Sequence, residues 1–112
     1  MATKNIRIIP GSQLTTGAVA YYTAPALTKC VIKRLTFTNT TATAVTVTAY
    51  LVSSAGSASA SNTIASARTV APGETWDCVS AEGQVVEAGG SVQALASSGT
   101  SITLIGSGIE VT

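Results

Sequence analysis

The sequence contains no histidine, and this absence removes the commonest general base and metal ligand of enzymes. A Ser–His–Asp or Cys–His catalytic arrangement therefore cannot be built from this chain. Asp77 is the single aspartate, so a calcium site rich in Asp is not expected. The one Gly-x-Gly, at Gly106 and Gly108, has no helix after it and does not indicate a phosphate-binding loop. We predict a protein that is not an enzyme and has no catalytic residues, metal or cofactor.

Charge is also scarce, because charged residues make up 10% of the chain, against about 25% in an average protein. The net charge is +1, but all six basic residues precede all five acidic ones. They are Lys4, Arg7, Lys29, Lys33, Arg34 and Arg68, followed by Glu74, Asp77, Glu82, Glu87 and Glu110. Three interpretations stay open: contact between copies, basic half against acidic half; pairing of strands from the two halves within one fold; or chance among eleven charges. The basic cluster at residues 29–34 has only Phe37 near it, so no nucleic-acid partner is expected.

Cysteine is limited to Cys30 and Cys78, which form neither a disulfide framework nor a metal-binding spacing. Each lies in a strand-like run, where a free cysteine packs as a small hydrophobe, although a bridge between two sheets stays open. No apolar run approaches 18 residues, so no membrane partner is expected. Residues 1–20 lack the apolar core of a signal peptide, and we expect synthesis and folding in a cytoplasm.

Small and β-branched residues fill the sequence, since Thr, Ala, Ser and Gly account for more than half of it. The segment from residue 36 to 52 predicts two strands folded about a turn at residues 39–43. In the second strand Val45, Val47, Ala49 and Leu51 share one face, and Thr46, Thr48 and Tyr50 share the other. Such a period of two is typical of a half-buried strand.

The same pattern predicts short strands along the whole chain, separated by turn signals every 8–12 residues. They cover residues 1–10, 19–23, 29–38, 43–52, 64–70, 75–79, 84–87, 92–96 and 101–111. We predict an all-β fold, an antiparallel β-sandwich of about eight strands, with a jelly roll favoured over an immunoglobulin-like topology. The chain of 112 residues supports one domain, residues 11–112, preceded by an N-terminal arm or edge strand at residues 1–10.

Three local patterns refine this prediction. In residues 29–38 we expect Val31, Leu35 and Phe37 to point inward, with Cys30, Ile32 and Thr36 on the other face. Ala71-Pro72-Gly73-Glu74 has the residues of a type II turn. Residues 53–61 predict a mobile loop, and the two glycines at 106 and 108 predict a bulge or kink.

Aromatic residues are few, and Trp76, Tyr21, Tyr22 and Tyr50 are the candidates for stacking on a sugar ring. A single tryptophan in a small β-sandwich belongs more often to the core or to a subunit interface. We therefore treat Trp76 as a partner contact and keep a carbohydrate-binding module with a glycan partner as an alternative.

The C-terminal half has a recurring texture: APGETW, then GQVVEAGGSVQALAS, then SITLIGSGIEVT, preceded by VTVTAYLVS, a Ser/Ala/Gly-rich loop and NTIASARTV. Over roughly residues 28–112 this texture resembles the small all-β virion proteins of tailed bacteriophages, which serve as accessory parts of heads, necks or tails. The motifs are strands and turns and include no catalytic signature.

This resemblance implies a structural virion protein, made in the host cytoplasm, with a capsid decoration (cement) protein as the best fit. Its partners would be capsid or other virion proteins and further copies of itself. The expected contacts are Ile6, Arg7, Ile8 and Ile9 of the N-terminal segment and one sandwich edge. A head–tail, tail or fibre component is the alternative within the same class.

Overall fold

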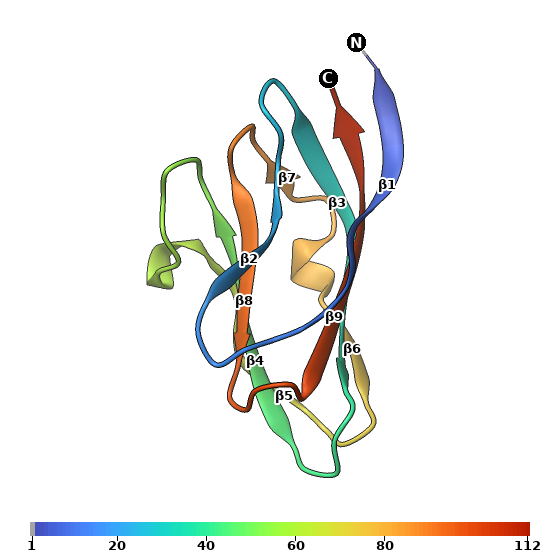
Figure 1. Ribbon diagram of the computed structural model, residues 1–112, viewed down its shortest axis with the longest axis vertical. Coiled ribbons are helices and arrows are strands. Elements are labelled where there is room, and N and C mark those ends of the chain that lie inside the picture. The colour runs from blue at the N-terminus through green and yellow to red at the C-terminus, as the bar shows by residue number, and fades with distance from the viewer. Residues whose placement is uncertain (1) are drawn as a thin grey trace.

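Two antiparallel sheets pack face to face in the computed structural model, which describes residues 2–112 (Figure 1). The first sheet contains β1 (Thr3–Gln13), β9 (Ile102–Val111), β3 (Lys29–Asn39), β6 (Thr75–Asp77) and β7 (Val85–Val86). The second contains β2 (Val19–Thr23), β8 (Ser91–Ala96), β4 (Val45–Val52) and β5 (Thr63–Val70). Two single-turn 3-10 helices, η1 (Ala60–Asn62) and η2 (Val79–Ala81), interrupt the strands. The predicted all-β antiparallel sandwich is confirmed.

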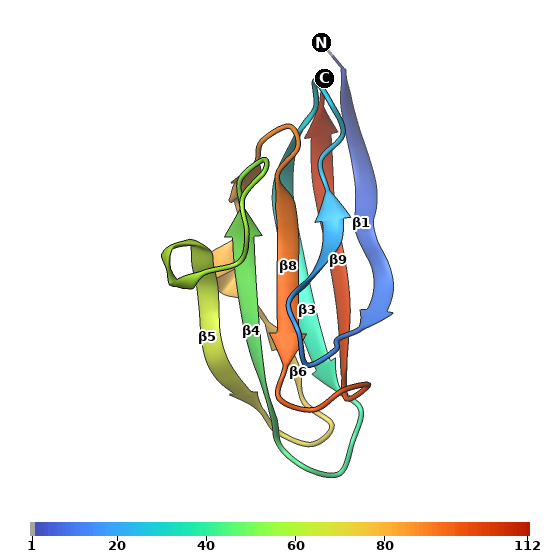
Figure 2. The same ribbon diagram turned by 60° about the vertical axis from the view of Figure 1, so that its left-hand side comes forward.

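Strand pairing is nested, so that the first strand pairs with the last and the middle strands pair with each other. β1 pairs with β9, β2 with β8, β3 with both β6 and β7, and β4 with β5. β3 and β4 therefore lie in different sheets, as the view onto the four-stranded sheet in Figure 2 shows. The two strands predicted in the segment from 36 to 52 are present as the end of β3 and as β4, and the turn between them carries the chain from one sheet to the other.

The core lies between the two sheets and is filled by the inward face of each strand. In β4 the predicted alternation is confirmed from Val45 to Ala49: Val45, Val47 and Ala49 are buried, and the residues between them are half-buried. It ends there, because Leu51 is half-buried and Val52 is buried. The largest buried side chains come from both ends of the sequence, and they include Phe37, Ile9, Leu14, Ile32, Leu35, Ile102 and Leu104. Early and late strands thus contribute to one core, which explains why no half of the chain reads as a separate domain.

β3 departs from the predicted alternation. Cys30 and Ile32 are fully buried and Val31 is half-exposed, so the inward and outward faces of this half are reversed relative to the prediction. The cause is a bulge between Ile32 and Arg34, which inserts one residue opposite β9 and shifts the side-chain period. Beyond the bulge Leu35 and Phe37 point inward as predicted.

β1 is an edge strand of the five-stranded sheet and continues beyond the predicted end at Pro10. A bulge between Ile9 and Ser12 accommodates Pro10 and Gly11, after which the strand pairs again with β9. Its start lies beside the C-terminus, where the amide N–H of Thr112 donates to the carbonyl of Ala2 at 2.9 Å. Met1, the first residue of the predicted segment 1–10, lies outside the described residues.

Two connections have hydrogen bonds that the sequence indicates. At the predicted type II turn Gly73 has φ +75°, and the N–H of Glu74 donates to the carbonyl of Ala71 at 3.0 Å. At the β3–β4 crossing the fully buried Asn39 amide donates to the carbonyls of Thr43 (2.8 Å) and Val70 (2.9 Å). Asn39 thereby ties the end of β3 to the loop that leads into β4 and to the end of β5 in the opposite sheet.

Candidate functional site

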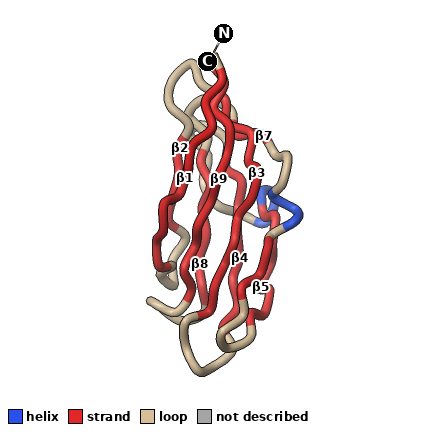
Figure 3. The backbone as a smooth tube through the Cα atoms, turned by 90° about the vertical axis from the view of Figure 1, so that its right-hand side faces the viewer, coloured by secondary structure: helices blue, strands red, loops and turns tan. Residues whose placement is uncertain are grey.

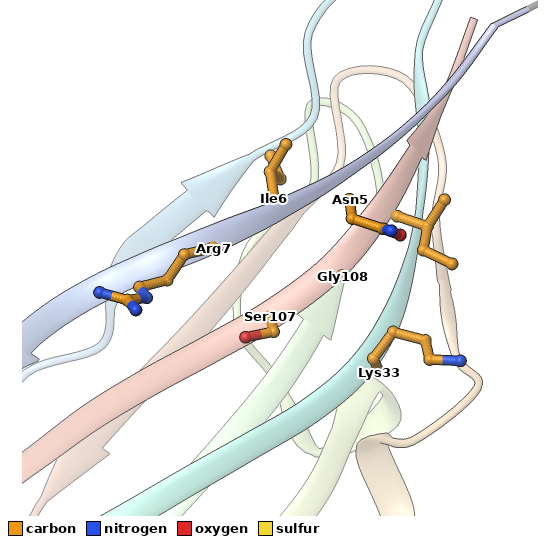
Figure 4. A pocket seen from close by; sticks show the side chains of 7 residues that line it. Asn5, Ile6, Arg7, Lys33, Ser107 and Gly108 are labelled. Atoms are coloured by element: carbon orange, nitrogen blue, oxygen red, sulfur yellow. The ribbon is translucent and has the colours of Figure 1, made fainter.

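A shallow groove crosses β1, β9 and β3 on the outer face of the five-stranded sheet (Figure 4). Figure 3 shows these three strands side by side. We call it the basic groove; its volume is about 570 Å³. Its lining residues are Asn5, Ile6, Arg7, Lys33, Ser107, Gly108 and Ile109. In Figure 4 Ser107 and Gly108 lie along the middle strand, with Arg7 on one side and Lys33 on the other.

Two bulges place these cations. On one side of β9, Ile6 is opposite Gly108 and Ile9 is opposite Gly106, so β1 has one extra residue there. On the other side Ile32 is opposite Gly108 and Arg34 is opposite Ser107, so β3 also has one extra residue. Arg7 and Lys33 lie in these two bulged segments, and bulges commonly redirect a side chain next to a functional site. The groove is therefore built by paired irregularities on both neighbours of β9.

The glycines of β9 make room for this arrangement. A Cβ on Gly108 would stand 2.8 Å from the carbonyl oxygen of Val31 and 2.9 Å from the Cys30 sulfur. A Cβ on Gly106 would stand 2.7 Å from Leu35 Cδ2. Both positions face the core, where the bulged neighbours crowd β9. The glycines predicted a bulge, and the structure places the bulges on β1 and β3, beside the glycines.

The charges around the groove are unevenly paired. Arg34 lies 3.5 Å from Asp77, and Lys29 lies 4.0 Å from Glu87; the Arg34, Lys29 and Glu87 side chains are largely exposed, and Asp77 is half-buried. Within residues 2–112 no other ion pair forms, which leaves Arg7 and Lys33 without an acidic partner. Two of the six basic residues thus pair with the acidic half inside the fold, and the groove holds cations that remain available to an anionic group.

The predicted contact residues fall into two groups. Arg7 is exposed and Ile6 is half-buried in the groove wall, where either can touch a partner. Ile8 and Ile9 are buried at 6% and 0% exposure, because the β1 bulge turns both neighbours inward. The prediction that Ile8 and Ile9 contact a partner is corrected: they belong to the chain's own core.

Trp76 closes the open side of the sandwich between β5 and β6. Its ring stacks on the buried Phe37 at 5.5 Å between centroids, and the Arg68 guanidinium lies 4.8 Å from its centroid. The contact joins one strand of each sheet through an aromatic pair and a cation–π pair. The indole is half-buried and already stacked inside the chain, so it is not presented as a free platform for a sugar ring.

The outer face of the four-stranded sheet has a different chemistry and no charged side chain among its cross-strand pairs. Thr48 is opposite Leu95, and Tyr50 is opposite Gln93, which is opposite Ala20. We call this surface the uncharged face; it consists of Ala20, Thr46, Thr48, Tyr50, Thr63, Gln93 and Leu95. A surface without charge that includes a tyrosine shares the depletion of charged residues found in the buried part of protein interfaces.

A polar contact inside the sandwich joins β2 to β9. The Tyr22 hydroxyl donates to Glu110 Oε2 at 2.7 Å. Burial, and then this hydrogen bond, raise the pKa of Tyr22 far above its usual value. Burial also raises the pKa of the Cys30 thiol, and a hydrogen bond with the Tyr22 side chain lowers this pKa in part. The Tyr22 hydroxyl and the Cys30 thiol therefore stay uncharged. The contact joins β2 to β9 and does not present a reactive thiolate.

The question of a Cys30–Cys78 bridge is answered, since both thiols are free and buried. Burial raises the pKa of the Cys78 thiol as well. Across residues 2–112 no three His, Cys, Asp or Glu side chains gather around a common point that could hold a metal ion. In the same range no helix is long and apolar enough to cross a membrane.

Comparisons with known proteins add little to this description. No family model matches the chain, and no curated protein matches it. One solved structure, titled "Structure of infectious bursal disease virus Gx strain", is similar over 97% of this chain and 30% of that chain. Its sequence identity is 18% and its TM-score 0.43, so the likeness carries no argument about function. The chain spans about a third of the length of that viral chain.

Sequence reasoning missed Lys33, Ser107 and Ile109 as parts of one surface. Their strands are far apart in the sequence, and only the pairing of β9 with both β1 and β3 brings them together. The signal that could have found them is the glycine pair in β9, because it marks the place where both neighbouring strands bulge.

Proposed function

We propose that the protein is a structural virion component, a decoration protein of a tailed bacteriophage that binds the capsid shell in many copies. The observation that carries the proposal is the uncharged face. It offers a surface of uncharged side chains on one sheet of the sandwich, and burying such a surface costs no desolvation of charge. The affinity would come from apolar area removed from water, at roughly 25 cal/mol per Å² before ordering costs, and from engagement of many copies.

The strand order supports the same proposal at the level of the fold. The first strand pairs with the last, and the pairing continues inward in the same way until β4 pairs with β5. This order suits a jelly roll, an architecture used by viral capsid and lectin domains. An immunoglobulin sandwich would instead place its first two strands side by side in one sheet, whereas β1 and β2 lie in different sheets. By analogy at the level of the fold, this strand order supports a shell-building role.

A matched pair of substitutions tests the shell contact. Leu95→Lys puts a charge at the centre of the uncharged face, and Ile105→Lys puts the same charge on the outer face of the other sheet. Binding to virions that lack the protein is measured by co-sedimentation. We expect Leu95→Lys to weaken binding by about tenfold or more, because a charge is then buried without a partner. Ile105→Lys should bind as the parent does.

Equal binding of both variants would contradict the uncharged face as the contact surface. Copy number decides between the two virion roles and is measured by quantitative mass spectrometry of purified virions against the major capsid protein. Hundreds of copies per particle support decoration of the shell. A small fixed number would contradict decoration and favour a head–tail, tail or fibre component.

A further inference from the structure

The outer face of the five-stranded sheet is aliphatic where β9 ends. Val31 of β3 lies opposite Ile109 of β9 on one side and opposite Val85 of β7 on the other, so these three side chains share one face. Val111, two residues after Ile109, lies on the same face. Val85 is 43% exposed, and the other three side chains are half-buried. The exposed side of an antiparallel sheet is usually polar, so this aliphatic row indicates a surface that a partner covers.

Leu27 extends this row, because it lines the same hollow as Val111. It lies in the turn between β2 and β3, which Figure 1 shows at the same end of the molecule as both termini. Its side chain is 91% exposed, and its backbone has φ +58°, which leucine rarely adopts. At the corresponding position of the other such turn the chain has Gly73, with φ +75°. A leucine that the turn disfavours and the core does not use points to a role outside the fold.

Hydrogen bonds hold both ends of this turn. Before Leu27, the N–H of the buried Ala24 donates to the carbonyl of Gly90 at 2.9 Å. After it, the N–H of the buried Thr28 donates to the carbonyl of Pro25 at 3.2 Å. A side chain that is displayed on a fixed backbone has less freedom to lose on binding, which favours its use as an anchor.

The hollow beside Leu27 is apolar, and its rim has no net charge. Its volume is about 340 Å³, and its other lining residues are Lys29, Glu87, Ala88, Val111 and Thr112. Lys29 and Glu87 lie 4.0 Å apart and are both largely exposed, so their charges offset each other at the rim. A protruding apolar side chain, an apolar hollow and a polar rim have the arrangement of a protein interface.

These features favour a protein as the occupant. A protein surface can supply both an apolar socket for Leu27 and an apolar side chain that fills the hollow. Binding to anionic lipid depends on clustered basic residues, whereas Lys29 at this rim is paired with Glu87. Nucleic acid needs free cations and aromatic side chains on which bases stack, and among the described residues that line the hollow none is aromatic.

We infer that Leu27 anchors a second docking surface and inserts into an apolar socket of a protein of the virion shell. We call this surface the Leu27 patch; it consists of Leu27, Val31, Val85, Ala88, Ile109 and Val111. The inference rests on the proposed function for the identity of the partner, and it adds a contact that the uncharged face does not include. It also accounts for the disfavoured turn, because burial of the leucine against the partner offsets the strain.

Three substitutions of Leu27 test the inference on the full chain. Leu27→Gly removes the side chain and suits the turn, Leu27→Asp puts a charge into the socket, and Leu27→Met keeps an apolar side chain of similar size. Co-sedimentation with virions that lack the protein measures each dissociation constant. We expect Leu27→Gly to bind about 10- to 100-fold more weakly, the factor that corresponds to one buried leucine side chain. Leu27→Asp should bind at least as weakly, and Leu27→Met within about threefold of the parent.

The matched control is Val79→Ser, because Val79 is also an exposed aliphatic residue, at 69% exposure, and lies in η2 outside the Leu27 patch. This variant should bind as the parent does. Photo-crosslinking identifies the occupant directly. The variant Leu27→p-benzoylphenylalanine, irradiated on the particles, should form crosslinks to a shell protein, and Val79→p-benzoylphenylalanine should not. Circular dichroism establishes that each variant is folded.

Failure of this inference and failure of the proposed function give different results. If Leu27→Gly and Leu27→Asp bind normally while Leu95→Lys binds weakly, the inference is overturned and the uncharged face stands. If the Leu27 variants bind weakly while Leu95→Lys binds normally, the inference stands and the uncharged face is contradicted. A parent that does not bind virions overturns both.

Two other occupants would also overturn the inference. One is a second copy of this chain, shown by dimerisation in light scattering that Leu27→Asp abolishes, or by crosslinks between copies. The other is a membrane, shown by binding to vesicles of phosphatidylcholine and phosphatidylserine that Leu27→Asp abolishes.

Discussion

At the scale of single residues, Gly106 and Gly108 differ in what would meet an added side chain. For Gly106 the obstacle is the methyl end of Leu35, which can turn aside, whereas for Gly108 it is the backbone carbonyl of Val31. We predict that Gly108→Ala lowers the free energy of unfolding by about 2–3 kcal/mol and Gly106→Ala by about 1 kcal/mol. Urea denaturation measures both.

The control for this comparison is Gly17→Ala. Nothing lies within 4 Å of a Cβ at Gly17, and its backbone conformation needs no glycine. The free energy of unfolding of this variant should be unchanged or up to about 1 kcal/mol higher, because alanine restricts the unfolded chain more than glycine does. Equal losses at positions 106 and 108 would show that the carbonyl of Val31 moves as easily as a side chain.

The two buried thiols predict a loss of stability in alkali. Because burial raises the pKa of Cys30 and Cys78 in the folded protein, the unfolded chain releases these protons first as the pH rises. Their contribution is complete below the pKa of an unfolded thiol, about 8.5, and declines above it by up to about 1.4 kcal/mol per pH unit for each thiol. The free energy of unfolding, measured in urea between pH 7 and pH 10, should fall accordingly.

Cys78→Ala separates the thiol effect from other alkaline effects. It removes one of the two titrating thiols, so the decline between pH 8.5 and pH 10 should become shallower even if the variant is less stable throughout. An unchanged slope would mean that the Cys78 thiolate is tolerated in the folded protein. Tyr22 acts in the same direction above pH 10, because its pKa is raised as well.

At the scale of elements, the turn between β2 and β3 contains a residue that its geometry disfavours. The N–H of Thr28 donates to the carbonyl of Pro25 at 3.2 Å, and Leu27 at the third position has φ +58°. A type II turn places glycine there. Leu27 is also 91% exposed, so its side chain contributes almost nothing to the core.

We therefore predict that Leu27→Gly raises the free energy of unfolding by about 0.5–1 kcal/mol. Relief of about 1–2 kcal/mol of backbone strain exceeds the added entropy of the unfolded chain. Leu27→Ala keeps the Cβ and should stay within about 0.5 kcal/mol of the parent. Thermal unfolding of the three proteins compares them, and a glycine variant no more stable than the alanine variant would refute the strain argument.

Strands were predictable from the sequence where the period of two is unbroken. Val19–Thr23 and the alternation of Val45, Val47 and Ala49 follow directly from the pattern of side chains. The faces of β3 and the length of β1 were not predictable, because each depends on a bulge that only the partner strand defines. Tertiary pairing, rather than local preference, decides on which side of a bulge a residue such as Cys30 points.

The candidate site was less accessible to sequence analysis than the fold. Arg7 was predicted as a contact from its place in the N-terminal segment, but its companions Lys33 and Ser107 come from β3 and β9. Strand order is a property of the folded chain, so no spacing in the sequence relates these three residues. Burial of Ile9 likewise depends on the bulge before it, because plain alternation would place Ile9 on the same face as the exposed Arg7.

At the scale of the whole molecule, nested pairing places both termini side by side, with Ala2 and Thr112 hydrogen-bonded to each other. We predict that a circular permutant that joins Thr112 to Ala2 through a short linker, with new ends between Ser54 and Ala55, folds cooperatively. Its free energy of unfolding should be at most about 2 kcal/mol below that of the parent, since the opened loop contains no buried side chain. Circular dichroism and urea denaturation check both statements.

A second permutant, opened between Thr41 and Ala42, is the matched control. It separates the buried Asn39 amide from the carbonyl of Thr43 and leaves a polar group without its partner. This permutant should be clearly less stable than the first. Equal stability would mean that the β3–β4 crossing adds nothing beyond chain connectivity.

The glycines of β9 also have an evolutionary consequence. A Cβ at position 108 avoids its loss of stability only if β3 loses its bulge or Cys30 becomes smaller, so these positions should change together among descendants of this chain. A lineage that regularises β3 would return Lys33 to the plain alternation of the strand and dismantle one wall of the groove. Retention of glycine at 108 would then mark the lineages that keep the groove, whichever residues line it.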